Sequence, residues 1–142
     1  MFNVVGAYSS GLISGKWPMR KLLSFIYLGR AILITVFLFT PPSLSSVIIF
    51  SIMMSLLWLA TVPPTSGLVV VMFGARYMSL LYGVVLLSHQ LGSFSGVWSG
   101  GWLYEHYGSY DFVWWLSVGL ALLAACAHLP IKEQPVARLS HG

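Results

Sequence analysis

A single arginine within a long apolar run is the residue of this chain with the clearest potential for chemistry. Arg30 lies in the run 22–40, about eight residues, or roughly 12 Å of α-helix, from the basic end of that run. A charge at this depth is costly in a membrane and is therefore a functional candidate by default. Two interpretations are open. Arg30 binds backbone carbonyls and carboxylates of neighbouring helices, or it contacts or attracts an anionic substrate.

A histidine and a glutamine, His89 and Gln90, lie near the middle of a second apolar run, 79–104. An imidazole there could bind substrate or take up a proton, or it could be a hydrogen-bonded side chain in helix packing. No Asp or Glu falls within a predicted span, so proton coupling would need His89 or a carboxylate that this sequence lacks. At 100° per residue, one narrow helix face holds several of these side chains: Tyr82, His89, Ser93, Gly96 and Gly100.

Hydroxyl side chains and one tryptophan flank a pair of prolines in the run 47–74. Pro63 and Pro64 predict a kinked or broken helix, because neither residue has a backbone N–H to donate. Broken helices form binding sites in transporters, but Ser and Thr also hold helices together, so the stripe lines a substrate cavity or joins helices. If the kink leaves the helical phase unchanged, the stripe covers an arc of about 100°: Ser51, Ser55, Trp58, Thr65 and Ser66, with Thr61 beside it.

Three glycines, Gly92, Gly96 and Gly100, form two overlapping G-x-x-x-G steps. Small residues at this spacing let helix backbones approach closely. We expect these glycines to serve helix packing, and a flexing point in the helix is the alternative.

The remaining reactive side chains do not form a catalytic set. Cys126 is the only cysteine, which excludes an internal disulfide and a cysteine metal cage. Glu105 and Asp111 have the character of solvated turn residues, and Asp111 can cap the last helix. At membrane depth there is no Ser/His/Asp set, carboxylate pair or His-rich site. We therefore expect no enzyme activity, no metal and no cofactor.

The composition requires lipid as the solvent of the elements that carry these residues. Hydrophobic residues make up 58% of the 142 residues, charged residues only 7%, and the mean hydropathy is +0.86. Soluble domains have roughly 25% charged residues. The net charge of +4 comes mostly from Lys and Arg in short breaks between apolar runs, so it indicates membrane topology rather than nucleic-acid binding.

The apolar runs predict an all-α membrane protein with about four full transmembrane helices and a partial N-terminal helix. The predicted helices cover residues 1–15, 22–40, 47–74, 79–104 and 112–129, and residues 130–142 form a polar tail. Lys and Arg occur in the connections at 16–21 and 76 and in the tail, at Lys132 and Arg138, which all fall on one side. The connections 43–46 and 105–111 have neither residue. By the positive-inside rule, the tail is cytoplasmic.

Three segments resemble the C-terminal part of a major facilitator superfamily transporter, from the end of helix 8 to helix 12. Residues 11–21, GLISGKWPMRK, resemble the superfamily's cytoplasmic loop motif, with Gly15 at the place of its Asp and Pro18 at the place of a Gly. Residues 100–111, GGWLYEHYGSYD, are similar to the connection between the last two helices, with Glu105 for Asp. Residues 58–67, WLATVPPTSG, resemble helix 10 of bacterial members near the monocarboxylate-porter-like branch.

This resemblance implies a fragment of a secondary active transporter in a cell membrane, the bacterial inner membrane in particular. It would move a small solute, an organic anion being one class, by alternating access. Its partners would be the lipid bilayer, the solute and the missing N-terminal half of the transporter, with no nucleic acid. The alternative is a non-transporting small membrane interaction protein or an inert remnant of a truncated transporter gene.

Overall fold

The computed structural model describes residues 1–41 and 43–136. All the regular secondary structure in these residues is helical. The helices are α1 (Phe2–Ser14), α2 (Met19–Phe39), α3 (Leu44–Leu59), α4 (Val62–Phe73), α5 (Met78–Tyr107) and α6 (Asp111–His128), with a 3₁₀ turn, η1, at Ala75–Tyr77. Within the described residues, four helical segments are long and apolar enough to cross a membrane: Met19–Phe39, Leu44–Phe73, Ala75–Tyr107 and Asp111–His128. The predicted all-α membrane fold is therefore confirmed.

The helix at the N-terminus is shorter than a membrane span. α1 has 13 residues, or about 20 Å at the rise of an α-helix, which is less than the roughly 30 Å of a bilayer core. The observed helix ends lie within three residues of the predicted ones. The largest differences occur where the observed helix includes an additional turn outside the apolar run, such as Met19–Lys21 at the start of α2. Backbone hydrogen bonds extend a helix beyond its apolar stretch. Of the tail, residues 137–142, with Arg138, lie outside the described residues.

Local sequence accounts for the ends of the helices. Ser43 begins α3 with a capping box, in which its hydroxyl accepts the Ser46 N–H and the Ser46 hydroxyl accepts the Ser43 N–H. Gly108 ends α5 in the left-handed conformation, at φ 65°. Gly74 ends α4 with φ 82°, a conformation that other residues rarely adopt.

The run 47–74 is broken into two helices. α3 ends at Leu59 and α4 begins at Val62, with Ala60 and Thr61 between them. The break lies directly before Pro63 and Pro64, which cannot donate backbone hydrogen bonds to the preceding turn. The broken helix that the prolines predict is thus present, and its bend leaves carbonyl groups of α3 in need of other donors.

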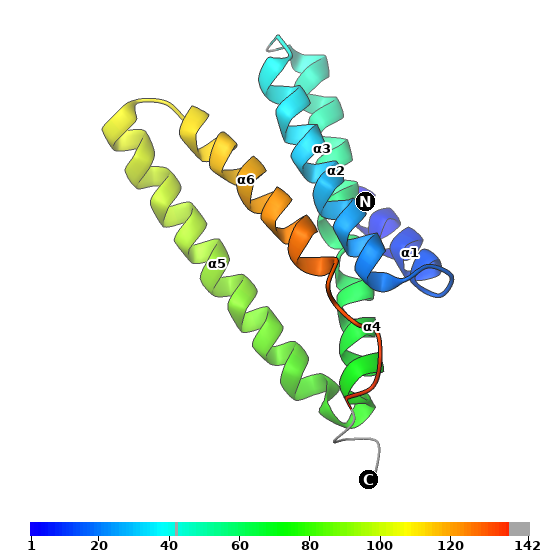
Figure 1. Ribbon diagram of the computed structural model, residues 1–142. Helices are drawn as coiled ribbons and strands as arrows, with labels where there is room; N and C mark the ends of the chain where they lie inside the picture. Colours follow the sequence, from blue (N-terminus) through cyan, green and yellow to red (C-terminus); the bar gives the residue numbers. More distant parts are fainter. Residues whose placement is uncertain (42, 137–142) are drawn as a thin grey trace.

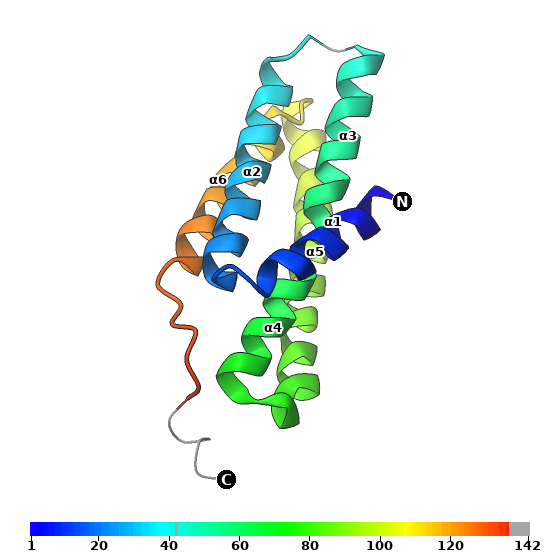
Figure 2. The ribbon, with the colours of Figure 1, turned by 90° about the vertical axis from the view of Figure 1, so that its right-hand side faces the viewer.

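The helices form an open bundle in which α2 is central (Figures 1 and 2). α6 and α3 lie against α2, and α1 crosses α3 and α4. Two small groups of buried apolar residues hold these helices together, Leu22, Ile26 and Ala60 in one and Ala31, Ile34 and Val118 in the other. A hydrogen bond from the Ser24 hydroxyl to the Ala125 carbonyl, 2.7 Å long, also joins α2 to α6.

The longest helix, α5, stands apart from the rest of the bundle. It contacts α4 near its N-terminal end and α6 weakly near its C-terminal end, as Figure 1 shows. Every residue from 83 to 98 is exposed. The middle of α5 therefore has no helix beside it within the described residues.

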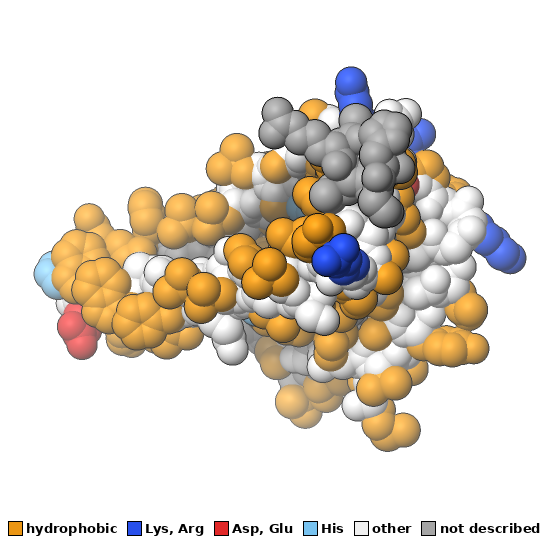
Figure 3. Space-filling view, turned by 90° about the horizontal axis from the view of Figure 1, so that it is seen from below, with side chains coloured by type: hydrophobic (Ala, Val, Ile, Leu, Met, Phe, Trp, Pro, Cys, Tyr) orange, Lys and Arg blue, Asp and Glu red, His pale blue; other side chains and the backbone are white. Residues whose placement is uncertain are grey.

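The connections fall into two groups at opposite ends of the bundle. The α2–α3 and α5–α6 connections lie at one end, and the α1–α2 and α4–α5 connections and the tail lie toward the other (Figures 1 and 2). Viewed from this second end, Lys and Arg side chains are spread among hydrophobic ones (Figure 3). The basic residues thus gather at one end, as the predicted topology requires, but this placement does not say which side of a membrane that end faces.

Candidate functional site

An open cavity of about 640 Å³ lies beside the α3–α4 break. Its walls come from α2, from both parts of the broken helix, from the N-terminal half of α5 and from the end of α6. It is lined by Tyr27, Arg30, Trp58, Leu59, Thr61, Val62, Thr65, Tyr82, Val85, Leu86, Ser88, His89 and His128. No carboxylate is among these residues, so the cavity contains a positive charge with no negative side chain opposite it.

Five of the seven residues that the sequence suggested for substrate binding line this one cavity: Arg30, Trp58, Thr61, Thr65 and His89. Ser55 lies instead in a smaller pocket of about 400 Å³ on the side of α1, with Asn3, Ser51 and again Trp58. Trp58 borders both pockets, so the predicted stripe faces two pockets, with Ser51 and Ser55 in one and Thr61 and Thr65 in the other. Gln90 is exposed on α5 and lines neither pocket.

Arg30 reaches from α2 to the last turn of α3. Its Nη2 donates to the carbonyl oxygens of Leu57 and Trp58, each at 3.0 Å. The helix ends just beyond these carbonyls, so they lack the donors that a continuing helix would supply. The guanidinium supplies them instead, which is the structural role that the sequence left open.

Aromatic rings surround the same guanidinium. Its Cζ lies 5.4 Å from the ring centroid of Tyr27 and 5.0 Å from that of Trp58, within the range of a cation–π interaction. The Arg30 Nε is buried and has no hydrogen-bond partner within the described residues. The Nη2 of Arg30 thus serves the broken helix, while its buried Nε–H has no acceptor within the described residues.

The threonine hydroxyls on the α4 side of the break are bound to their own chain. Thr61 Oγ1 donates to the Trp58 carbonyl at 3.2 Å, and Thr65 Oγ1 donates to the Thr61 carbonyl at 2.6 Å. Each hydroxyl oxygen keeps its capacity to accept a hydrogen bond. These threonines therefore support the break and can offer the cavity acceptors but no hydroxyl proton.

The two histidines of the cavity are held differently. His128 Nδ1 lies 2.6 Å from the Ala124 carbonyl, and its ring stacks on Tyr27 with centroids 5.2 Å apart. This contact makes Nδ1 the donor, which leaves Nε2 free. No hydrogen bond of His89 is found within the described residues, and its side chain is exposed. His89 is thus the less constrained of the two.

Sequence reasoning did not select Tyr27 and His128 as site residues. Tyr27 precedes Arg30 by three positions and so shares its helix face, a signal that was available. His128 occupies the last turn of α6 and looked like the end of a span. Its place beside Tyr27 depends on how α6 packs on α2, which no local pattern reveals.

The three packing glycines have unequal surroundings. A Cβ added at Gly100 would meet the Val113 side chain at 3.8 Å, so this glycine faces α6. A Cβ added at Gly92 or Gly96 would have no neighbour within 4 Å in the described part of the chain. For Gly92 and Gly96, the packing role stays a prediction.

The described residues contain no group of three His, Cys, Asp or Glu side chains that could hold a metal ion. Comparison with protein-family models, curated proteins and solved structures finds no match to this chain. The resemblance to the major facilitator superfamily therefore stays a prediction.

Proposed function

We propose that this membrane protein is part of a secondary active transporter and that the cavity beside the α3–α4 break binds its solute. The observation that carries the proposal is the convergence of Arg30, Trp58, Thr61, Thr65 and His89 on one cavity. These residues come from three separate apolar segments. Broken helices beside a cavity are a recurring arrangement for solute sites in transporters.

A small organic anion is the solute class that suits this cavity best. Arg30 supplies a positive charge, and no lining side chain is acidic. Trp58, Tyr27 and Leu59 offer apolar surface for the body of such a solute. A neutral solute would leave the arginine charge without a counter-charge at membrane depth, which is costly.

Transport by alternating access requires two bundles that rock about a central site. The five apolar segments described above would be one of them, in line with the resemblance to the C-terminal part of a major facilitator. The opposing helices would come from an N-terminal half that this sequence lacks. The membrane would be a bacterial inner membrane, with the basic end of the bundle in the cytoplasm.

Uptake in the native cell tests the proposal. Replacing the gene by an Arg30→Gln variant is expected to lower the uptake of at least one small organic anion by tenfold or more, as loss of a charged hydrogen bond of about 1.5–3 kcal/mol implies. Arg76→Gln is the matched control, since it removes one positive charge at the α4–α5 connection. Unchanged uptake of every anion tested, at equal amounts of protein in the membrane, would refute the solute role of Arg30.

A second candidate function is a non-transporting interaction protein of the membrane. The observation that favours it is the bare middle of α5, where residues 83–98 are exposed and Gly92 and Gly96 have open space around them. Cross-linking in native membranes separates the two. A partner chain that is captured from cysteines at these glycines, together with anion uptake that does not depend on Arg30, would favour the second function.

A further inference from the structure

An apolar groove that shares no lining residue with the solute cavity lies between the end of α1 and the start of α2. It has a volume of about 520 Å³ and is lined by Leu12, Ile13, Lys16, Trp17, Leu22 and Phe25. Apart from Lys16, each of these side chains offers apolar surface, and most of them are exposed. The groove therefore presents a hydrophobic channel that has a positive charge at one end.

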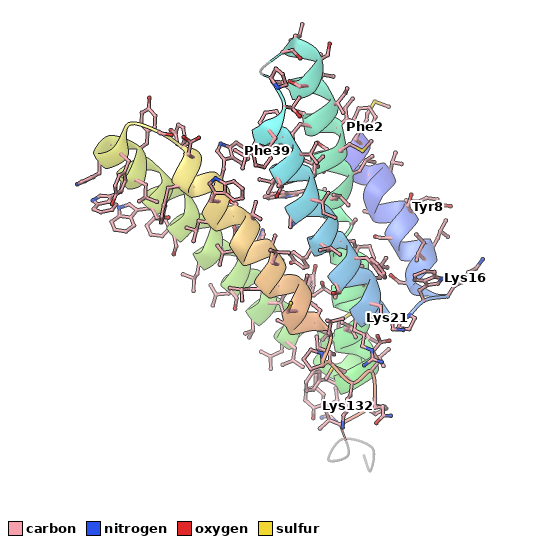
Figure 4. All side chains as sticks on the ribbon, turned by 45° about the horizontal axis from the view of Figure 1, so that its top comes forward. Phe2, Tyr8, Lys16, Lys21, Phe39 and Lys132 are labelled. Atoms are coloured by element: carbon pink, nitrogen blue, oxygen red, sulfur yellow. The ribbon has the colours of Figure 1, made fainter. Side chains whose placement is uncertain are left out.

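The charge at this end is not neutralised by the protein. No hydrogen bond or ion pair of the Lys16 or Lys21 ammonium group is found within the described residues. Lys16 lies at the α1–α2 connection and lines the groove, and Lys21 lies in the first turn of α2, next to the groove residue Leu22 (Figure 4). The Glu133 carboxylate accepts a hydrogen bond from the backbone N–H of Arg20 at 2.8 Å. The Arg20 guanidinium donates to the Ile131 carbonyl at 3.2 Å, so the two lysines are the cations that remain available.

The direction of the groove suits a lipid. It begins at the basic connection, which is polar, and runs along the first turns of α2 to Phe25, about 9 Å into the helix at 1.5 Å per residue. Trp17 stands at its mouth, with its ring centroid 6.5 Å from that of Phe25, and tryptophan favours the headgroup level of a bilayer. An acyl chain descends from its headgroup in the same way, from the polar surface into the apolar layer.

We propose that this groove binds one anionic phospholipid of the surrounding leaflet. The phosphate of the lipid pairs with Lys16 and Lys21, and one acyl chain lies on Leu12, Ile13, Leu22 and Phe25. Charge complementarity selects an anionic headgroup, and the apolar length of the groove selects a lipid over a free phosphate. The lipid joins α1 to α2, which contact each other little directly. This site is independent of the proposed transport function, because none of its residues lines the solute cavity.

Native mass spectrometry of the full chain in detergent tests the site without the need for any variant. Phosphatidylglycerol is expected to give one adduct that resists delipidation, and phosphatidylcholine with the same acyl chains is expected to bind at least tenfold more weakly. Glycerol phosphate, the soluble headgroup, should not displace the lipid at equal concentration. Equal binding of the two lipids would overturn the charge argument, and displacement by glycerol phosphate would overturn the role of the groove.

Two charge-matched double variants locate the site. Lys16→Gln with Lys21→Gln is expected to weaken the phosphatidylglycerol adduct about 30-fold, from about fivefold per lysine at an anionic surface. Arg76→Gln with Lys132→Gln removes the same charge elsewhere and should leave the adduct within threefold of the wild type. Equal losses in both double variants would show a general charge effect and overturn the proposed site.

Discussion

At the scale of single residues, the structure shows one of the two roles that the sequence left open for Arg30, the binding of backbone carbonyls, and the contact with an anion stays a prediction. Its Nη2 donates to two carbonyls of the last turn of α3, while its Nε is buried and has no hydrogen-bond partner within the described residues. An arginine can do both, because its planar group has five donors on two edges. Under the proposed function, the same residue that supports the helix break would attract an anion in the cavity.

Arg30→Gln is expected to destabilise the bundle by about 1–3 kcal/mol, since two carbonyls lose a charged donor. Arg30→Lys should recover part of this loss, because an ammonium group keeps the charge but not the planar geometry or the ring contacts. Unfolding in mixed micelles with increasing SDS, followed by tryptophan fluorescence, measures both. Arg76→Gln is the control and should change stability by less than about 0.5 kcal/mol. Equal losses for Arg30→Gln and Arg76→Gln would show that the contact at the break contributes nothing specific.

At the scale of the elements, close packing of α1 on α3 depends on one glycine. A Cβ added at Gly6 would overlap the carbonyl group of Leu56, which is backbone and has little freedom to move. The short helix α1 can therefore pack closely on α3 because Gly6 has no side chain. Gly83 in α5 is the opposite case, because a Cβ there meets nothing within 4 Å.

Gly6→Ala is expected to push α1 away from α3, at a cost of about 1–3 kcal/mol for an overpacked contact. Hydrogen exchange of the α1 amides should become faster, and the SDS concentration at the unfolding midpoint should fall. Gly83→Ala, the same chemical change in open space, should leave both measurements near those of the wild type. An α1 that exchanges no faster in Gly6→Ala would contradict the contact with Leu56.

A second contact between elements joins the tail to the start of α2. The N-cap position of α2 is Pro18, which provides no side-chain cap, and the Glu133 carboxylate accepts the Arg20 N–H at 2.8 Å instead. The tail is also bound to α4, where the Val136 N–H donates to the Met72 carbonyl at 2.9 Å. A carboxylate at a helix N-terminus also interacts favourably with the helix dipole.

Glu133→Ala is expected to cost about 0.5–2 kcal/mol, as for the loss of a helix cap. The Arg20 amide should exchange faster with solvent, and the tail should become easier to cleave with protease. Glu133→Gln keeps an acceptor oxygen and should restore much of the protection. Glu105→Ala is the control, because Glu105 is exposed at the far end of α5. If Glu105→Ala speeds exchange at Arg20 as much, the proposed cap is wrong.

At the scale of the whole molecule, the sequence predicts the membrane-spanning segments, because lipid requires them to be apolar. It does not predict the contacts between helices that are distant in the sequence. Lipid demands long apolar runs, so hydropathy alone predicted the four spans, and the prolines predicted the break. Ser55 and Thr61 line different pockets, and Trp58 borders both. The bond from Arg30 to Leu57, 27 positions away, depends on the register of α2 against α3, and no local pattern contains it.

The orientation in the membrane is also a property of the whole molecule. The connections at Lys16–Lys21 and Arg76 and the tail lie toward one end of the bundle, and Figure 4 places Lys16, Lys21 and Lys132 there. The connections at the other end have no Lys or Arg. Since short cytoplasmic connections are enriched in Lys and Arg, we predict that the basic end is cytoplasmic.

Reporter fusions in a bacterial host test this orientation. A green fluorescent protein fused after residue 142 or after residue 77 should fluoresce, and alkaline phosphatase fused after residue 109 should be active, because the two reporters work on opposite sides of the inner membrane. A charge-reversed variant replaces Lys16, Arg20 and Lys21 by Gln and adds three Lys residues between 43 and 46. The fusion after residue 77 is expected to fluoresce less in this variant, because the asymmetry of Lys and Arg between the two ends of the bundle, which sets the orientation, is then reversed. The matched control adds three Gln residues at the same place and should keep the original orientation. Active phosphatase after residue 142 in the unaltered chain would invert the topology and would put the basic groove and its lysines on the outer leaflet.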